Sequence, residues 1–158
     1  MTNVERIKKE LEESGVKSFS NTNVEVDYLT LPKDLTVLPT SDISKYLNAI
    51  VQQRMYVRTL MSDARAIYRE AKSNFDKEKC RVFASCPPRM SVTEKELKVF
   101  NDLDAEESRK FMEYALEKFD YLKDVLTSYE DGTFLVSREL SRRLKDFEDS
   151  NRSGKFNA

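Results

Sequence analysis

Hydrophobic residues recur at a regular spacing of four and three positions between Ser41 and Phe83. A repeat that averages three and a half residues is typical of a coiled-coil seam, and no Gly or Pro interrupts it before Pro87. The pattern predicts one helix of about forty residues, roughly 60 Å long, which is more than a compact domain can cover. Arg54 breaks the seam, which otherwise consists of Ile43, Leu47, Ile50, Val57, Met61, Ala64, Tyr68, Ala71 and Phe75.

A second helical pattern follows the loop that contains Pro87 and Pro88. Ser91 and Glu94 have the spacing of a capping box, which predicts a helix start. The acidic segment 101–107 is interpreted either as a break or as an exposed stretch of helix. The seam then returns through Met112, Ala115, Phe119, Leu122, Leu126 and Tyr129.

The Asp131-Gly132 pair predicts the end of this second long helix and a tight turn. A short third helix is expected over residues 133–147, with one apolar face formed by Val136, Leu140, Leu144 and Phe147. The fold class is therefore all-α, a long helical hairpin with a short C-terminal helix. Because two helices alone lack a full core, we expect the hairpin to assemble into a helical homo-oligomer.

The flanking segments carry simpler signals. Thr2 and Glu5 predict a capped short helix that ends before Gly15, with Val16 placed for a Schellman stop. Apolar and polar residues alternate irregularly over residues 17–40, with strand-like spacing around Val24. This segment is expected to form an extended arm. We divide the chain into an N-terminal helix and arm (1–40), a helical oligomerisation and DNA-binding core (41–148) and a disordered tail (149–158).

The composition argues against most kinds of catalysis. The chain has no His, and its three glycines stand alone, so neither a common general base nor a phosphate-binding loop is present. The carboxylates of residues 102–107 lack the convergence or the Gly that two-metal and calcium sites need. We therefore expect a binding protein without a cofactor or metal, not an enzyme. Two cysteines without metal-site spacing and the absence of a long apolar run favour a soluble protein of a reducing cytoplasm.

Charge is segregated along the chain although the net charge is only −1. Residues 42–92 hold ten Lys/Arg against five Asp/Glu, and residues 93–131 hold six against twelve. Helical geometry places six cations in one arc beside the seam: Arg54, Arg58, Arg65, Arg69, Lys72 and Lys79. Such a row suits a phosphate backbone, with Tyr56 and Tyr68 as candidate base-stacking residues, although the place of Tyr68 on the seam favours core packing. Equally, it could be a solvated face or a set of intersubunit salt bridges.

The order of these features resembles the UvsY family of phage recombination mediators. The resemblance rests on Ser44-Lys45-Tyr46-Leu47-Asn48 at the start of the basic helix and on Glu96-Leu97-Lys98-Val99 at the start of the next, and it covers residues 41–148. The spacing from Phe119 through Asp131 to the Arg-rich segment ending at Phe147 also matches.

This resemblance implies a ring-like homo-oligomer, a hexamer or heptamer, that binds single-stranded DNA in the host cytoplasm. Such a protein helps a RecA-like recombinase to replace single-strand-binding protein, and Arg69 and Lys72 match the family's DNA-contacting positions. The competing hypothesis is a phage structural or assembly coiled-coil protein without nucleic-acid binding. In that protein the basic row would pair with the acids of residues 102–124 across an interface. The sequence alone does not identify what those acids contact.

Overall fold

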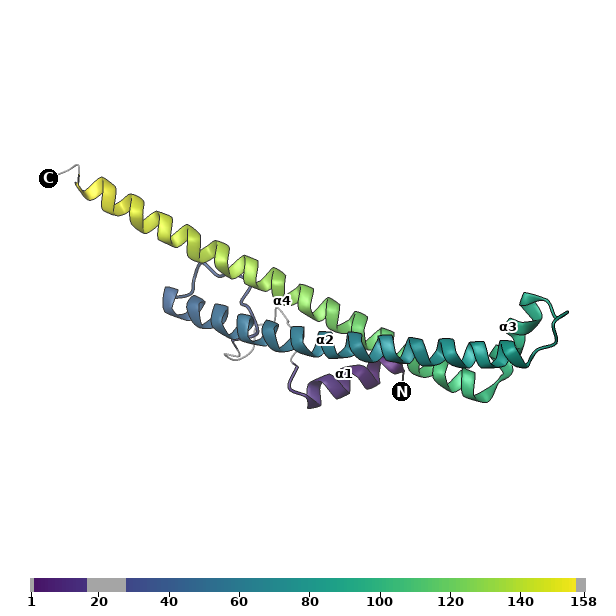
Figure 1. Ribbon diagram of the computed structural model, residues 1–158. Helices are drawn as coiled ribbons and strands as arrows, with labels where there is room; N and C mark the ends of the chain where they lie inside the picture. Colours follow the sequence, from purple (N-terminus) through teal and green to yellow (C-terminus); the bar gives the residue numbers. More distant parts are fainter. Residues whose placement is uncertain (1, 17–27, 156–158) are drawn as a thin grey trace. The chain divides into compact units, whose positions relative to one another are not determined.

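The computed structural model describes residues 2–16 and 28–155, and these residues form four α-helices. The helices are α1 (Asn3–Glu13), α2 (Thr40–Ser85), α3 (Val92–Asn101) and α4 (Leu103–Lys155). The two long helices, α2 and α4, run antiparallel and pack as a hairpin (Figure 1). The all-α class and the hairpin are thus confirmed, and the homo-oligomer stays a prediction because the structure describes a single chain.

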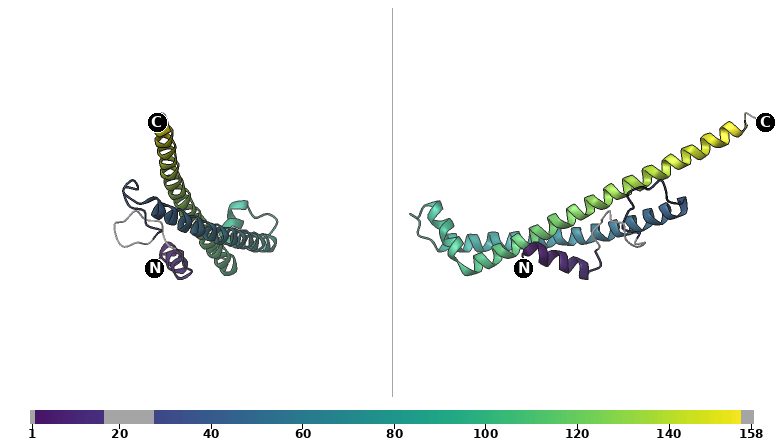
Figure 2. Two further views of the ribbon diagram at one scale, coloured as in Figure 1. Left: turned by 90° about the vertical axis from the view of Figure 1, so that its left-hand side faces the viewer. Right: turned by 180° about the vertical axis from the view of Figure 1, so that it is seen from behind.

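The chain groups into two compact units. The first unit comprises Met1–Glu10 and Thr59–Lys123, and the second comprises Leu11–Arg58 and Asp124–Ala158. Each unit therefore contains part of α2 and part of α4, and Figure 2 shows these helices from two further directions. No helix within the described ranges is long and apolar enough to cross a membrane.

The long helix α2 follows its predicted seam. Ile43, Ile50 and Val57 are fully buried, and Ala64 and Ala71 are nearly so. The remaining seam positions are half-buried. Burying one stripe of an amphipathic helix supplies most of its stability in water, which explains why α2 continues for 46 residues without a break.

Local hydrogen bonds define the ends of the shorter helices. Thr2 and Glu5 form the predicted capping box on α1, with backbone-to-side-chain distances of 2.8 and 3.3 Å. Gly15, with φ of 81°, ends that helix, and the Val16 N–H donates to the Leu11 carbonyl at 2.8 Å. This geometry is the Schellman stop expected from the sequence.

The helix α3 begins and ends as a separate element. Ser91 caps it through the predicted capping box with Glu94. Asp102, with extended backbone angles, then ends α3, and its side chain accepts a hydrogen bond from the Ala105 N–H at 3.0 Å. Within the acidic segment 101–107, Asp102 alone is the break between two helices, and its carboxylate serves to start α4, which contains residues 103–107.

The predicted end of the second long helix at Asp131-Gly132 is wrong. The helix α4 runs through this pair without interruption, so the expected short C-terminal helix is its continuation. Gly132 is buried in the seam between Tyr129 and Val136, which are both fully buried. Burial of these flanking side chains outweighs the roughly 1 kcal/mol that a mid-helix Gly costs. The helix also continues to Lys155, into the segment 149–158 that we expected to be a disordered tail.

The first unit has its core where α2, α3 and α4 meet. Val82, Val99 and Ala105 are buried together, with Phe75 and Phe83 packed against them. Elsewhere in this unit, α1 buries Ile7 and adds polar contacts to this packing. Glu10 pairs with Lys118 at 2.8 Å and with Arg6 at 3.4 Å. The Arg6 guanidinium lies 4.8 Å from the centre of the Tyr114 ring. Burial, together with the nearby Glu10 carboxylate, raises the pKa of Tyr114 to about 12.

In the second unit, Arg143 of α4 contacts the segment that precedes α2. Its guanidinium donates to the carbonyls of Leu35 and Thr36, each at 3.1 Å, and to the Thr40 hydroxyl at 3.1 Å. Its Nε donates to Glu139 at 2.7 Å. Arg143 therefore fastens the segment before α2 to α4.

The part of the expected arm that the structure describes, residues 28–40, packs on the chain's own helices. Leu31 is buried, and the Tyr28 ring meets the Tyr46 ring edge-on with centroids 5.2 Å apart. The strand-like spacing around Val24 lies outside the described residues.

Candidate nucleic-acid interface

The six cations predicted to form one row differ in their surroundings. Arg58, Arg65, Arg69 and Lys72 are exposed on α2, whereas Arg54 and Lys79 are half-buried. Arg54 and Arg58 belong to the second unit, and the other four belong to the first. Within the first unit, Arg65, Arg69 and Lys72 recur at intervals of four and three residues and so lie on one face of α2.

Lys79 is already engaged inside the first unit. Its ammonium lies 3.8 Å from a Glu96 carboxylate oxygen of α3 and 5.5 Å from the centre of the Phe83 ring. A cation held between an acid and an aromatic face is less available to an external phosphate. We therefore remove Lys79 from the central set of the candidate interface.

The exposed cations have no acidic partner in the part of the chain that the structure describes. Arg58, Arg65, Arg69 and Lys72 form no ion pair there. By contrast, Lys45 near the start of α2 pairs with Asp42, and Arg81 near its end pairs with Glu78 and Asp102. The middle of α2 thus carries positive charge that the described residues do not neutralise.

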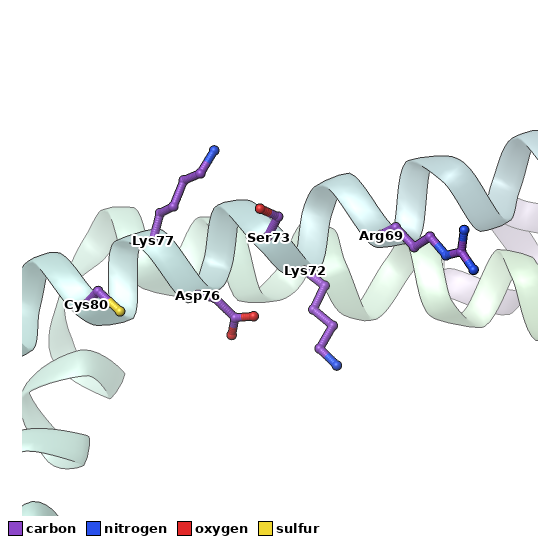
Figure 3. Close-up of a pocket in the computed structure, with 6 residues that line it drawn as sticks. All are labelled: Arg69, Lys72, Ser73, Asp76, Lys77 and Cys80. Atoms are coloured by element: carbon purple, nitrogen blue, oxygen red, sulfur yellow. The ribbon is translucent and has the colours of Figure 1, made fainter.

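Part of this surface is a shallow, open depression of about 520 Å³ (Figure 3). All of its lining residues belong to α2, so it is the outer surface of one helix rather than a cleft between elements. In the close-up, Lys72 and Asp76 extend to one side of the helix and Lys77 extends to the other. The complete lining is Arg69, Lys72, Ser73, Asp76, Lys77 and Cys80.

Lys77 is a cation that the sequence reasoning missed. It lies outside the arc of about 80° that defined the predicted row, since it is about 140° around the helix from Lys72. Lys77 is only about 80° around the helix from Arg69, on the side away from Lys72, so it borders the same depression (Figure 3). Extending the arc by about 80° beyond Arg69 would have included Lys77 without admitting Asp63 or Glu70.

The two candidate stacking residues are both held by contacts within the chain, although Tyr56 is 40% exposed. The Tyr56 hydroxyl donates to the Ser14 carbonyl at 2.7 Å, which ties α2 to the end of α1 within the second unit. Tyr68 is half-buried in the seam. The binding that this surface supports is therefore mainly electrostatic, through phosphate groups.

Several acids of residues 102–124 pair with cations of the first unit, and these cations do not belong to the exposed row on α2. Asp102 and Asp104 lie 2.7 and 3.4 Å from Arg81. Glu106 pairs with Lys110 at 2.6 Å, and Glu113 pairs with Arg109 at 2.7 Å. Among the described residues, no group of three or more potential ligands is placed to hold a metal ion.

Comparison with models of known protein families, with curated proteins and with solved structures finds no match to this chain.

Proposed function

We propose that this protein is a recombination mediator that binds single-stranded DNA and promotes the loading of a RecA-like recombinase in place of single-strand-binding protein. The supporting observation is the exposed, unneutralised set of cations on α2, centred on Arg65, Arg69 and Lys72. Arg and Lys on a rigid helix replace the counterions condensed along a phosphate backbone, and this release favours binding.

The proposed mechanism is physical and requires no covalent chemistry. In a ring-like homo-oligomer, each subunit contributes a few phosphate contacts, and their sum gives strong binding by multivalency. DNA bent along such a surface is held less well by single-strand-binding protein. The recombinase then gains access to the displaced strand and starts its filament.

The direct test is fluorescence anisotropy of a labelled single-stranded oligonucleotide, titrated with the protein at several salt concentrations. With six or more phosphate contacts per assembly, affinity should fall by about 100-fold or more between roughly 50 and 200 mM salt. Light scattering after size exclusion on the same sample gives the subunit number. Absence of binding at low salt would contradict the proposal.

A pair of matched double variants tests where the DNA binds. Arg69→Ala with Lys72→Ala should weaken DNA binding by at least about tenfold while the oligomer stays intact. Arg138→Ala with Lys145→Ala removes the same charge from exposed positions of α4 and should change affinity far less. Equal losses in both doubles would show that only net charge matters.

The competing function is a structural coiled-coil protein. In that protein, the cations of α2 would pair with acids of a neighbouring subunit. The Arg69→Ala and Lys72→Ala double would then dissociate the oligomer, and raised salt would do the same to the unmodified protein. Light scattering distinguishes these outcomes without any DNA.

A further inference from the structure

The residues that line the depression on α2 form two neighbouring rows. Residues four apart are neighbours on the surface of a helix, and rows of this spacing run at an angle to the helix axis. One row consists of Arg69, Ser73 and Lys77. The other consists of Lys72, Asp76 and Cys80. In Figure 3, Lys77 extends from the side of the helix away from Lys72 and Asp76.

The first of these rows continues towards the start of α2 with another cation. Arg65 lies four residues before Arg69, so the row holds four consecutive hydrogen-bond donors: Arg65, Arg69, Ser73 and Lys77. We call these four residues the donor row. All four are exposed. At about 1.5 Å per residue, neighbouring donors lie ~6 Å apart along the helix axis, and the whole row extends ~18 Å.

The side chains of the donor row are available to a ligand. Arg65, Arg69 and Lys77 form no ion pair with any residue that the structure describes. The Ser73 hydroxyl likewise has no hydrogen bond within the described ranges, whereas Ser44 and Ser141 donate to the backbone carbonyl four residues earlier. A phosphate oxygen accepts hydrogen bonds from guanidinium, ammonium and hydroxyl groups alike.

Acids border the donor row on both sides and restrict the path of a phosphate backbone. Asp76 lies on the neighbouring row, between Lys72 and Lys79, and so interrupts the arc in which these cations were expected to act together. Glu70 lies on the opposite side, three residues before Ser73. The depression itself keeps three cations against one acid. A phosphate that follows the donor row therefore meets donors, and one that leaves it approaches a carboxylate.

The donor row also leads away from the packed side of α2. At 100° per residue, Lys77 lies about 120° around the helix from Ala71, which is buried in the seam. Lys79, by contrast, lies only about 40° from Phe75, which packs against the core of the first unit. The donor row thus ends on the outer side of α2, whereas the straight arc ends beside the packed core.

We propose that single-stranded DNA follows the donor row, so that Ser73 and Lys77 contact its phosphates in addition to Arg65 and Arg69. Asp76 keeps the strand from continuing straight towards Lys79. This inference rests on the proposed function and assigns the path of the strand on that same surface. An unpaired strand can adjust its phosphates to the ~6 Å interval of the donors, as strands do on other basic surfaces that follow the backbone.

Two lysines of α2 distinguish the two paths in a titration of fluorescein-labelled oligothymidine. Lys77→Ala should weaken binding by about fivefold at roughly 100 mM salt and lower the salt slope by about 0.7, as expected for one lost phosphate contact. Lys79→Ala should weaken binding by less than about twofold, because Glu96 already lies beside that ammonium. A loss in Lys79→Ala that equals or exceeds the loss in Lys77→Ala would overturn the proposed path.

Ser73 tests the path through an uncharged group. Ser73→Ala should weaken binding by about threefold and leave the salt slope unchanged, because a hydrogen bond is lost but no charge. Ala favours a helix more than Ser does, so unfolding of α2 would not explain this loss. Unchanged affinity in Ser73→Ala would overturn the contact with Ser73.

A matched pair of charge variants gives a larger effect at the same position. Ser73→Asp should weaken binding by at least about tenfold, because it places a carboxylate among the phosphates. Ser141→Asp makes the same change of net charge at an exposed position of α4 and should change affinity by less than about twofold. Equal losses in the two variants would overturn the proposed path.

Failure of the path and failure of the proposed function give different results. Absence of oligonucleotide binding by the unmodified protein at low salt would overturn the function and the path together. Binding that Arg69→Ala weakens by about fivefold, while Lys77→Ala and Ser73→Asp leave it unchanged, would support the function and overturn the path alone.

Discussion

Two arginine-rich stretches of this chain look alike in sequence and differ in structure. On α4, Arg142 and Arg143 both donate to Glu139, at distances of 2.7 to 2.9 Å. On α2, Arg65, Arg69 and Lys72 meet no acid among the described residues and face solvent. The first group stabilises the fold of its unit, and the second leaves positive charge available to a ligand.

The difference arises from what surrounds each group. The Glu139 side chain is only 10% exposed and that of Arg143 is 18% exposed, so their attraction is weakly screened by water. Hydrogen bonds from Arg142 and Arg143 lower the pKa of Glu139 to about 2. Helical cations therefore need not indicate a binding surface, because burial and pairing with acids decide which role they have.

The largest expected effect is on stability, from Arg143→Ala. This change removes the hydrogen bonds to Leu35, Thr36 and Thr40 and leaves Glu139 with fewer donors. The free energy of unfolding should fall by on the order of 2–3 kcal/mol, because charge-assisted and poorly exposed hydrogen bonds are removed. Urea denaturation monitored by circular dichroism measures it. An unchanged midpoint would mean that the segment before α2 does not depend on Arg143.

The pH dependence of stability tests the same cluster. The folded pKa of Glu139 lies below its ordinary value of 4.5, so the unfolded chain binds the proton first as the pH falls. The stabilisation is fully present above about pH 5 and is lost as the pH approaches the folded pKa of about 2. Melting temperatures of the unmodified protein and of Glu139→Gln should therefore converge as the pH falls through this range. A constant gap down to pH 2 would contradict the assignment.

A smaller loss of stability is expected from Arg142→Ala. Its side chain is 52% exposed, so solvent already weakens its pairing with Glu139 and with Asp146. The melting temperature should fall by clearly less than in Arg143→Ala. If the two variants are equally destabilised, the hydrogen bonds of Arg143 to the Leu35 and Thr36 carbonyls contribute little.

The smallest effect on stability is expected from Arg65→Ala on α2. An exposed residue without a described partner should change the unfolding free energy by no more than about 0.5 kcal/mol. Its effect should appear instead in DNA binding, where the salt slope should decrease by about 0.7 for each phosphate that the variant no longer neutralises. A destabilised protein with unchanged DNA affinity would mean that Arg65, like Arg143, stabilises the fold and does not bind DNA.

Much of the fold follows from the sequence because its signals are local. The four-and-three spacing of apolar residues determines the seams of α2 and of α4. Side-chain caps at Thr2 and Ser91 and the positive φ of Gly15 act within five residues along the chain. Hydrogen bonds over such short separations form in the same way whatever surrounds the helix. The arc of cations on α2 was also predictable, since helical geometry alone places them together.

Only the tertiary structure decided how those local signals are used. Gly132, which by itself favours a helix end, stays helical because the flanking Tyr129 and Val136 are buried against the rest of their unit. Arg143 is structural because it meets carbonyls 107 and 108 positions earlier in the chain. Lys79 is less available to a ligand than the exposed cations of the row, because α3 brings Glu96 beside it. Burial and ion pairing depend on which distant segments converge, and no spacing within one helix encodes that convergence.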